Sequence, residues 1–136
     1  MVQINVNYLG DLRTEAVHGP SAARLLTDAP RDNQGQGASF SPTDLLATAL
    51  GTCMLTIMGI VARRHAWSLA GAKVSVEKIM MNEPVRRVAR LVLQFDLPAA
   101  LAPEARKTLE GAALSCPVHK SLHPDIALES TFRYVV

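Results

Sequence analysis

One stretch constrains the fold of this chain more than any other. Residues 45–62, LLATALGTCMLTIMGIVA, contain no charged side chain, and Cys53 lies at the middle of the run. Ser41 suits an N-cap position and Asp44, three residues later, completes a pattern typical of a capping box. The basic pair 63–64 complements the negative end of a helix dipole. The flanks therefore predict a long apolar helix.

A run of about 18 apolar residues also reaches the lower limit for a transmembrane helix. This run contains three threonines and two glycines, and the chain has no other long apolar segment. Residues 1–10 lack the basic start of a signal peptide. We therefore expect a cytoplasmic protein with no membrane span. The helix should be buried on nearly all sides, by a sheet and by a second copy of the chain.

The composition limits the classes of partner. The 136 residues are 49% hydrophobic and 19% charged, with a formal net charge of +2. Residues 1–136 are long enough for a single domain with its own core. The deficit of charge fits an extensive subunit interface. The small net charge and the lack of a basic run argue against a nucleic-acid partner.

Hydrophobic periodicity predicts the remaining elements. Apolar residues recur every second position in several segments, which is typical of half-buried strands. A long loop without periodicity precedes the apolar helix, and prolines open two later helices. Because strands and helices come in blocks, the sequence indicates an α+β fold with mainly antiparallel sheets. The predicted strands are 2–8, 12–18, 23–27, 69–81, 87–97 and 125–136, the loop is 28–39, and the later helices are 103–115 and 116–122.

The two cysteines lie in opposite settings. Cys116 precedes Pro117 at the start of a helix, where backbone N–H groups and the dipole should lower the pKa of a thiol. Cys53 is in mid-helix, where burial alone would raise its pKa and leave it inert unless another element brings a cation. Each cysteine could also be a small buried hydrophobe. A zinc site is a further alternative, with Cys116, His119 and His123 on one helix face and Cys53 or water as the fourth ligand.

Two segments resemble a known family. FSPTDLLATALGTCM, together with the later SCPVHKSL, is similar to the OsmC/Ohr family of thiol-dependent hydroperoxide reductases, and the order of elements matches over nearly the whole chain. The resemblance implies an OsmC-like α+β fold with antiparallel sheets wrapped around a long central helix that carries a cysteine. It also implies an intertwined homodimer with active sites at the interface, and neither a cofactor nor a metal.

The resemblance also implies roles for individual residues. Cys53 matches the peroxidatic cysteine, whose thiolate is oxidised to a sulfenic acid by an organic hydroperoxide. Cys116 matches the resolving cysteine, which forms a disulfide that an external dithiol then reduces. In the family an arginine from the early strands stabilises the peroxidatic thiolate. Arg13 is the best match here and Arg24 the second choice, because a guanidinium keeps its charge in an apolar pocket.

The sequence departs from the family pattern at one important position. Members of the family carry a glutamate ten residues before the peroxidatic cysteine, and here that position is Thr43. Asp44 could replace the glutamate or could simply cap the helix. His119 also stands where a small polar residue is expected. The alternative function is therefore a non-enzymatic OsmC-like dimer that binds a hydrophobic or thiol-bearing ligand in the interface cleft.

Overall fold

The structure is a computed structural model that describes all of residues 1–136. The chain divides into two units, residues 1–46 and 47–136, and each is considered by itself below. The expectation that residues 1–136 form one domain stays a prediction.

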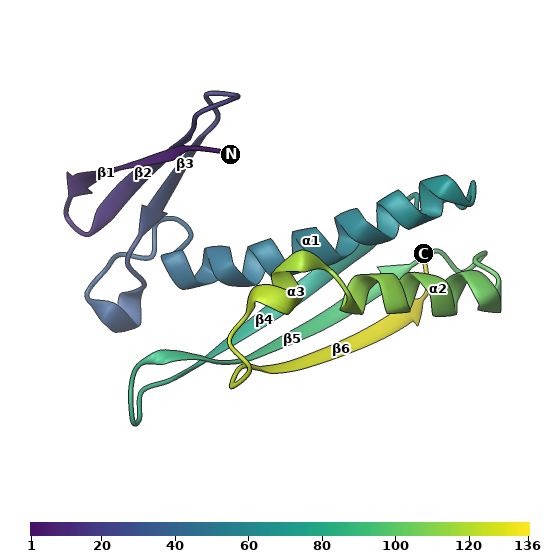
Figure 1. The fold of residues 1–136 in the computed structure, drawn as a ribbon. Coiled ribbons are helices and arrows are strands. Elements are labelled where there is room, and N and C mark those ends of the chain that lie inside the picture. The colour runs from purple at the N-terminus through teal and green to yellow at the C-terminus, as the bar shows by residue number, and fades with distance from the viewer. The chain divides into compact units, whose positions relative to one another are not determined.

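The N-terminal unit is built on a three-stranded antiparallel sheet (Figure 1). Its strands are β1 (Ile4–Gly10), β2 (Arg13–His18) and β3 (Arg24–Asp28), in the order β1-β2-β3. All three strands were predicted, with ends that differ by up to two residues. The apolar face of β1 is exposed within the chain, at 60% for Ile4, 61% for Val6 and 68% for Tyr8.

The segment between β3 and the apolar helix is the predicted loop, with one 3-10 turn, η1 (Arg31–Asn33). Gly35 shows why this loop folds back closely on the end of β3. A Cβ atom on Gly35 would lie only 1.7 Å from the carbonyl oxygen of Ala29, so only glycine allows this approach. The backbone N–H groups of Gly35 and Gly37 then donate to the oxygens of Pro30 and Ala29, at 3.0 and 3.1 Å.

The C-terminal unit contains a second three-stranded sheet (Figure 1). Antiparallel β4 (Lys73–Met81) and β5 (Arg87–Leu97) confirm the predicted hairpin, and β6 (Ala127–Tyr134) pairs with β5 in parallel. Two helices, α2 (Pro103–Leu114) and α3 (Pro117–Ser121), connect β5 to β6. A helical crossover of this length returns the chain in the same direction, which explains the parallel pair in a fold that is otherwise antiparallel.

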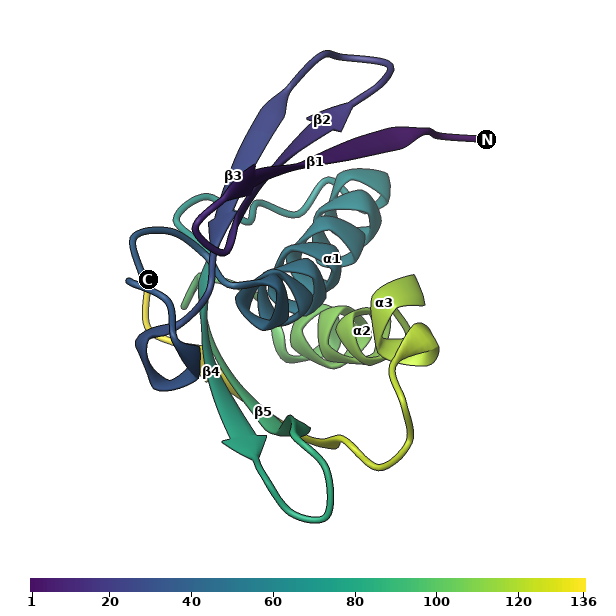
Figure 2. The ribbon, with the colours of Figure 1, turned by 90° about the vertical axis from the view of Figure 1, so that its left-hand side faces the viewer.

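The apolar helix is α1 (Pro42–Arg64), close to the bounds that its flanks predict. From Ala47 onwards it packs, with α2, on the same face of the second sheet (Figures 1 and 2). At Gly51 the helix backbone comes very close to the sheet, because a Cβ atom there would meet a methyl group of Val76 at 2.8 Å. The buried positions of α1 recur every three or four residues and define one side of the helix: Ala47, Leu50, Met54, Met58 and Ala62.

The other side of α1 is more open within one chain. Thr52, Thr56 and Ile60 are exposed, because a sheet and a neighbouring helix cover only one side of a helix. By length and composition α1 could cross a membrane, but its buried side belongs to a protein core. Burial of this open side of α1 by a second copy of the chain stays a prediction.

The core of this unit lies between α1, α2 and β5. Alternate side chains of β5 are fully buried from Leu91 to Leu97, as its period of two predicts. The alternation shifts near the start of the strand, where Val88 is buried in place of Ala89. A β-bulge causes the shift, because Ile79 pairs with Arg90 while Met80 pairs with Val88, which leaves Ala89 as an extra residue.

Candidate functional site

The fold brings the two cysteines of the chain together. Cys53 lies at the middle of α1 and Cys116 at the start of α3, and both belong to the C-terminal unit. Both are free thiols, and the Cys53 side chain is close enough to Cys116 to raise its pKa. Two neighbouring free thiols are the pair from which a disulfide can form, so the arrangement is suited to redox chemistry.

Cys116 is the N-cap residue of α3, as the Cys-Pro pattern predicts. Its sulfur accepts a hydrogen bond from the backbone N–H of His119 at 3.3 Å. The prediction that this position lowers the pKa of the thiol is nevertheless wrong. Burial raises the pKa of Cys116, and this effect exceeds the lowering by the His119 N–H; the neighbouring Cys53 thiol raises it further. The fully buried Cys116 therefore favours the protonated thiol.

Cys53 is the more accessible of the two thiols. It is half-buried, between the exposed Thr52 and the buried Met54 on α1. Within one chain, Cys53 lies at the border of the open side of the helix, and burial of the helix on nearly all sides, which requires a second copy, stays a prediction. A reagent can reach its sulfur more easily than that of Cys116, which suits an attacking nucleophile.

The histidines near Cys116 have separate environments. The ring Nδ1 of His119 is buried and has no hydrogen-bond partner. His123 lies beyond the end of α3 and its ring Nδ1 accepts a hydrogen bond from the backbone N–H of Asp125 at 3.2 Å. Because the helix ends at Ser121, His123 does not continue the helix face of Cys116 and His119. No three His, Cys, Asp or Glu side chains gather in a way that could hold a metal, so the geometry gives the zinc alternative no support.

The two candidate arginines belong to the N-terminal unit and have different carboxylate partners. The Arg13 Nε atom lies 3.8 Å from Oδ1 of Asp28, and its guanidinium also donates to the side-chain oxygen of Gln36 at 3.0 Å. Arg24 donates to Glu15 at 2.8 Å, in a more exposed ion pair. Arg13 therefore faces a buried carboxylate, whereas Arg24 forms a surface ion pair of low energetic value.

Asp44 caps α1. Its carboxylate accepts a hydrogen bond from the Ser41 N–H at 2.8 Å, and the Ser41 hydroxyl accepts one from the Asp44 N–H at 3.1 Å. This reciprocal pair is the capping box that the sequence predicts. The Thr43 hydroxyl lies 3.2 Å from that of Ser41. The structure thus shows Asp44 in its capping role, one of the two alternatives that the sequence left open.

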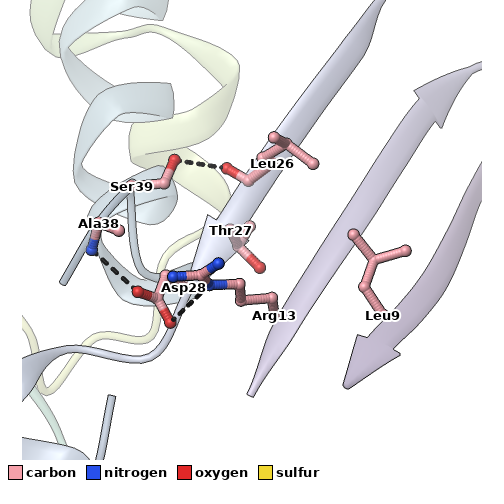
Figure 3. Close-up of a pocket in the computed structure, with 7 residues that line it drawn as sticks. All are labelled: Leu9, Arg13, Leu26, Thr27, Asp28, Ala38 and Ser39. Atoms are coloured by element: carbon pink, nitrogen blue, oxygen red, sulfur yellow. Dashed lines mark hydrogen bonds and ion pairs between the residues drawn. The ribbon is translucent and has the colours of Figure 1, made fainter. Parts of the chain in front are cut away.

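Asp28 was missed by sequence reasoning, which treated it as the first residue of a loop. It is the last residue of β3, its side chain is 1% exposed, and it lines a cavity of about 280 Å³ (Figure 3). The strand register could have identified it, because Asp28 on β3 lies directly opposite Arg13 on β2. The lining residues all come from the N-terminal unit: Leu9, Arg13, Leu26, Thr27, Asp28, Ala38 and Ser39.

Comparisons with known proteins agree on one family. Residues 35–131 match the family model described as OsmC-like protein. A solved structure from Psychrobacter arcticus 273-4, provisionally named an osmotic stress induced and detoxification response protein, is 46% identical. The similarity covers 98% of this chain and 96% of that one, with a TM-score of 0.92. No protein with a curated description matches the chain significantly.

More distant structures share the fold. An organic hydroperoxide resistance protein from Elizabethkingia anophelis is 13% identical, with a TM-score of 0.78 over 99% of this chain and 96% of that one. A provisionally named organic hydroperoxide resistance protein from Vibrio cholerae, with captopril bound in one of its active sites, is 17% identical. Its TM-score is 0.76, over 99% of this chain and 92% of that one. The matched segment and the close relative place this chain in the OsmC family.

Proposed function

We propose that this protein is a thiol-dependent peroxidase that reduces organic hydroperoxides. The observation that carries the proposal is the pair of neighbouring free thiols, Cys53 and Cys116. Membership of the OsmC family supports a redox role, and the Elizabethkingia anophelis protein with the same fold is named for organic hydroperoxide resistance.

Cys53 is the nucleophile in this proposal. It is half-buried and so can be reached by a peroxide, whereas Cys116 is fully buried and its raised pKa favours the protonated thiol. The Cys53 thiolate attacks the terminal oxygen of the hydroperoxide and the O–O bond breaks. Cys53 becomes a sulfenic acid, and the departing alkoxide takes up a proton to leave as the alcohol.

Cys116 resolves the sulfenic acid. Its sulfur attacks the sulfur of the Cys53 sulfenic acid, the S–O bond breaks, and the departing hydroxide leaves as water with the Cys116 proton. The proximity of the two side chains supports this step. An external dithiol then reduces the Cys53–Cys116 disulfide and is itself oxidised to a disulfide.

Three further elements complete the proposal, and the first two come from the family resemblance. Arg13 stabilises the Cys53 thiolate, with Arg24 as the second choice. Two chains form the homodimer that completes the active site. The protein acts in the cytoplasm, where dithiol reductants are kept reduced.

Thiol substitutions test the proposal. Wild-type protein, Cys53→Ser and Cys116→Ser are mixed with cumene hydroperoxide, and peroxide loss is followed with dithiothreitol as reductant. We expect Cys53→Ser to reduce turnover to background. Cys116→Ser should accumulate a Cys53 sulfenic acid that dimedone traps, and wild type without reductant should lose two hydrogens by mass spectrometry. Full turnover by Cys53→Ser would contradict the proposal.

A non-enzymatic, ligand-binding dimer is the second candidate. Thr43 stands where the family carries a glutamate, and captopril, a thiol-bearing molecule, occupies an active site of the Vibrio cholerae protein. This candidate expects thiols that do not react with hydroperoxide and a hydrophobic or thiol-bearing molecule that stays bound. Native mass spectrometry of the purified protein tests it, because a retained ligand adds a fixed mass to the chain. A ligand-free spectrum together with rapid peroxide turnover would exclude it.

A further inference from the structure

The short helix α3 is stabilised by local hydrogen bonds. The Lys120 N–H donates to the carbonyl oxygen of Cys116 at 3.1 Å, and the Ser121 hydroxyl donates to that of Pro117 at 2.8 Å. The helix has five residues, whereas isolated helices shorter than about 12–15 residues are barely stable in water. The position of α3 therefore depends on its N-terminal cap and on the packing of its half-buried side chains.

The cap of α3 is a sulfur atom that disulfide formation also requires. Cys116 Sγ accepts the His119 N–H at 3.3 Å, and Cys53 is its neighbouring thiol. A covalent S–S bond brings two sulfur atoms closer than separate thiols can lie, so one cysteine has to move when it forms. Cys53 lies in the middle of a helix of 23 residues, whereas Cys116 begins a helix of five. Cys116 is therefore the cysteine that moves, and the His119 N–H loses its acceptor.

The His119 side chain favours release of α3 once the cap is lost. Its ring Nδ1 atom is buried and has no hydrogen-bond partner. A buried polar atom without a partner is costly, and a hydrogen bond to water would recover that cost. Water can reach this atom only when α3 moves away from the core. The closed position of α3 thus combines one interaction that the disulfide removes with one cost that opening relieves.

We propose that Cys116 is a redox-controlled cap of α3. When the two thiols lose their hydrogens to an oxidant and the Cys53–Cys116 disulfide forms, the cap is lost and residues 117–122 move into solvent. When a dithiol reduces the disulfide, the Cys116 sulfur returns to the His119 N–H and α3 closes. The segment is anchored beyond α3, where Arg87 donates to the carbonyl oxygen of Asp125 at 3.4 Å.

The opening assists reduction of the disulfide, a role that rests on the proposed function. A dithiol that attacks the half-buried Cys53 forms a mixed disulfide with it and expels Cys116 as a thiolate. Burial of Cys116 disfavours that thiolate, whereas water can stabilise it when α3 has moved away. The second thiol of the reagent then displaces Cys53, and the reagent leaves as a disulfide.

Hydrogen exchange measured by NMR tests the opening on the full chain. Diamide oxidises protein labelled with nitrogen-15, because its N=N bond takes up the two thiol hydrogens and becomes a hydrazine. We expect the amides of residues 118–122 to exchange about tenfold faster in the oxidised protein than in the reduced protein. The amides of α2 should keep their rates. No disulfide with diamide, equal rates at residues 118–122 in both states, or an increase spread over the whole chain would overturn the proposal.

Two substitutions separate the cap from the disulfide. Cys116→Ser keeps an N-cap acceptor but cannot form the disulfide, so diamide should leave its exchange rates at residues 118–122 unchanged. Cys116→Ala has neither, so the same amides should exchange about tenfold faster without any oxidant. An alanine variant as protected as reduced wild type would contradict a capping role of the sulfur. If a variant does not fold, the comparison of reduced and oxidised wild type decides the question alone.

His119→Leu tests the role in reduction. Leucine has no polar ring atom, so the closed position of α3 should be favoured, and dithiothreitol should reduce the diamide-formed disulfide about tenfold more slowly. Lys120→Leu, the same new side chain at an exposed position of α3, is the matched control and should be reduced at the wild-type rate. Equal rates for His119→Leu and Lys120→Leu would refute this role.

Peroxide turnover by wild type, measured separately, distinguishes the two proposals. Opening on oxidation by diamide, in a protein that does not turn over cumene hydroperoxide, would refute the proposed function and leave the redox-controlled cap intact. Turnover through a disulfide that forms without faster exchange at residues 118–122 would do the opposite.

Discussion

At the scale of single residues, the environment of Cys116 shows that local sequence context does not fix the ionisation of a thiol. The cap position provides the expected hydrogen bond from the His119 N–H. Burial outweighs it, because removal of water disfavours the thiolate more than one backbone N–H favours it. The half-buried Cys53 and the fully buried Cys116 are thus chemically distinct, although they are neighbours.

The raised pKa of Cys116 predicts a loss of stability in alkali. The folded protein holds this proton at a pH where the unfolded chain, with a thiol pKa of about 8.5, has released it. The contribution is therefore fully present below about pH 8.5 and is lost as the pH rises through the folded pKa. We expect the free energy of unfolding to fall as the pH rises above about 8.5, and to fall less in Cys116→Ala.

Urea denaturation in the presence of a reductant measures this difference. The two proteins share every other titrating group, including Tyr134, whose pKa burial also raises, so those contributions cancel in the comparison. Parallel pH dependences for wild type and Cys116→Ala would show that Cys116 does not titrate as expected.

At the scale of elements, the packing of α1 on β4 depends on the absence of a side chain at Gly51. The helix approaches the sheet so closely that a Cβ atom would lie 2.8 Å from one methyl group of Val76 and 3.4 Å from one of Val74. This contact positions the helix turn that precedes Cys53. The geometry of the thiol pair therefore rests on a glycine that contributes no functional group.

Gly51→Ala should destabilise the protein in spite of the higher helix propensity of alanine. Overpacking of a core costs about 1–3 kcal/mol, whereas alanine in a helix gains at most about 1 kcal/mol over glycine. Gly111→Ala in α2 is the matched control, because its Cβ atom would meet nothing within 4 Å. We expect thermal unfolding to show a lower midpoint for Gly51→Ala and a slightly higher one for Gly111→Ala. A midpoint raised by both substitutions would mean that α1 does not press on β4 in solution.

At the scale of the whole molecule, apolar surface exposed within one chain is the feature that most needs a partner. The face of β1 formed by Ile4, Val6 and Tyr8 is more than half exposed, and the open side of α1 adds Ile60 at 41%. Exposed apolar surface that is continuous along a strand is typical of a protein interface. The proposed homodimer would cover such surface.

Val6→Asp tests the dimer. Light scattering after size-exclusion chromatography should give twice the chain mass of 14.7 kDa for wild type. A charge on the apolar face of β1 would be buried in the dimer, so we expect Val6→Asp to weaken association by at least about 2 kcal/mol. Asn5→Asp, on the opposite face of the same strand, should remain dimeric. A monomeric wild type, or a Val6→Asp protein that dimerises equally well, would contradict the prediction.

The sequence by itself determined the elements, because their causes are local. The capping pair of Ser41 and Asp44, the basic end of α1 and the Cys-Pro start of α3 depend on residues within one or two helical turns. The period of two along β5 reflects burial on one face of a strand. The paired cysteine motifs were also sufficient to suggest the family, which the comparisons confirm.

Only the tertiary structure decided which side chains come into contact and how these contacts change their chemistry. The parallel pairing of β6, the proximity of Cys53 to Cys116, and the position of Asp28 opposite Arg13 all join residues that are far apart in the sequence. The raised pKa of Cys116 depends on how much water the packed chain removes, and no local pattern reports that quantity. Local interactions select the elements, whereas burial and long-range register set the chemistry of the candidate site.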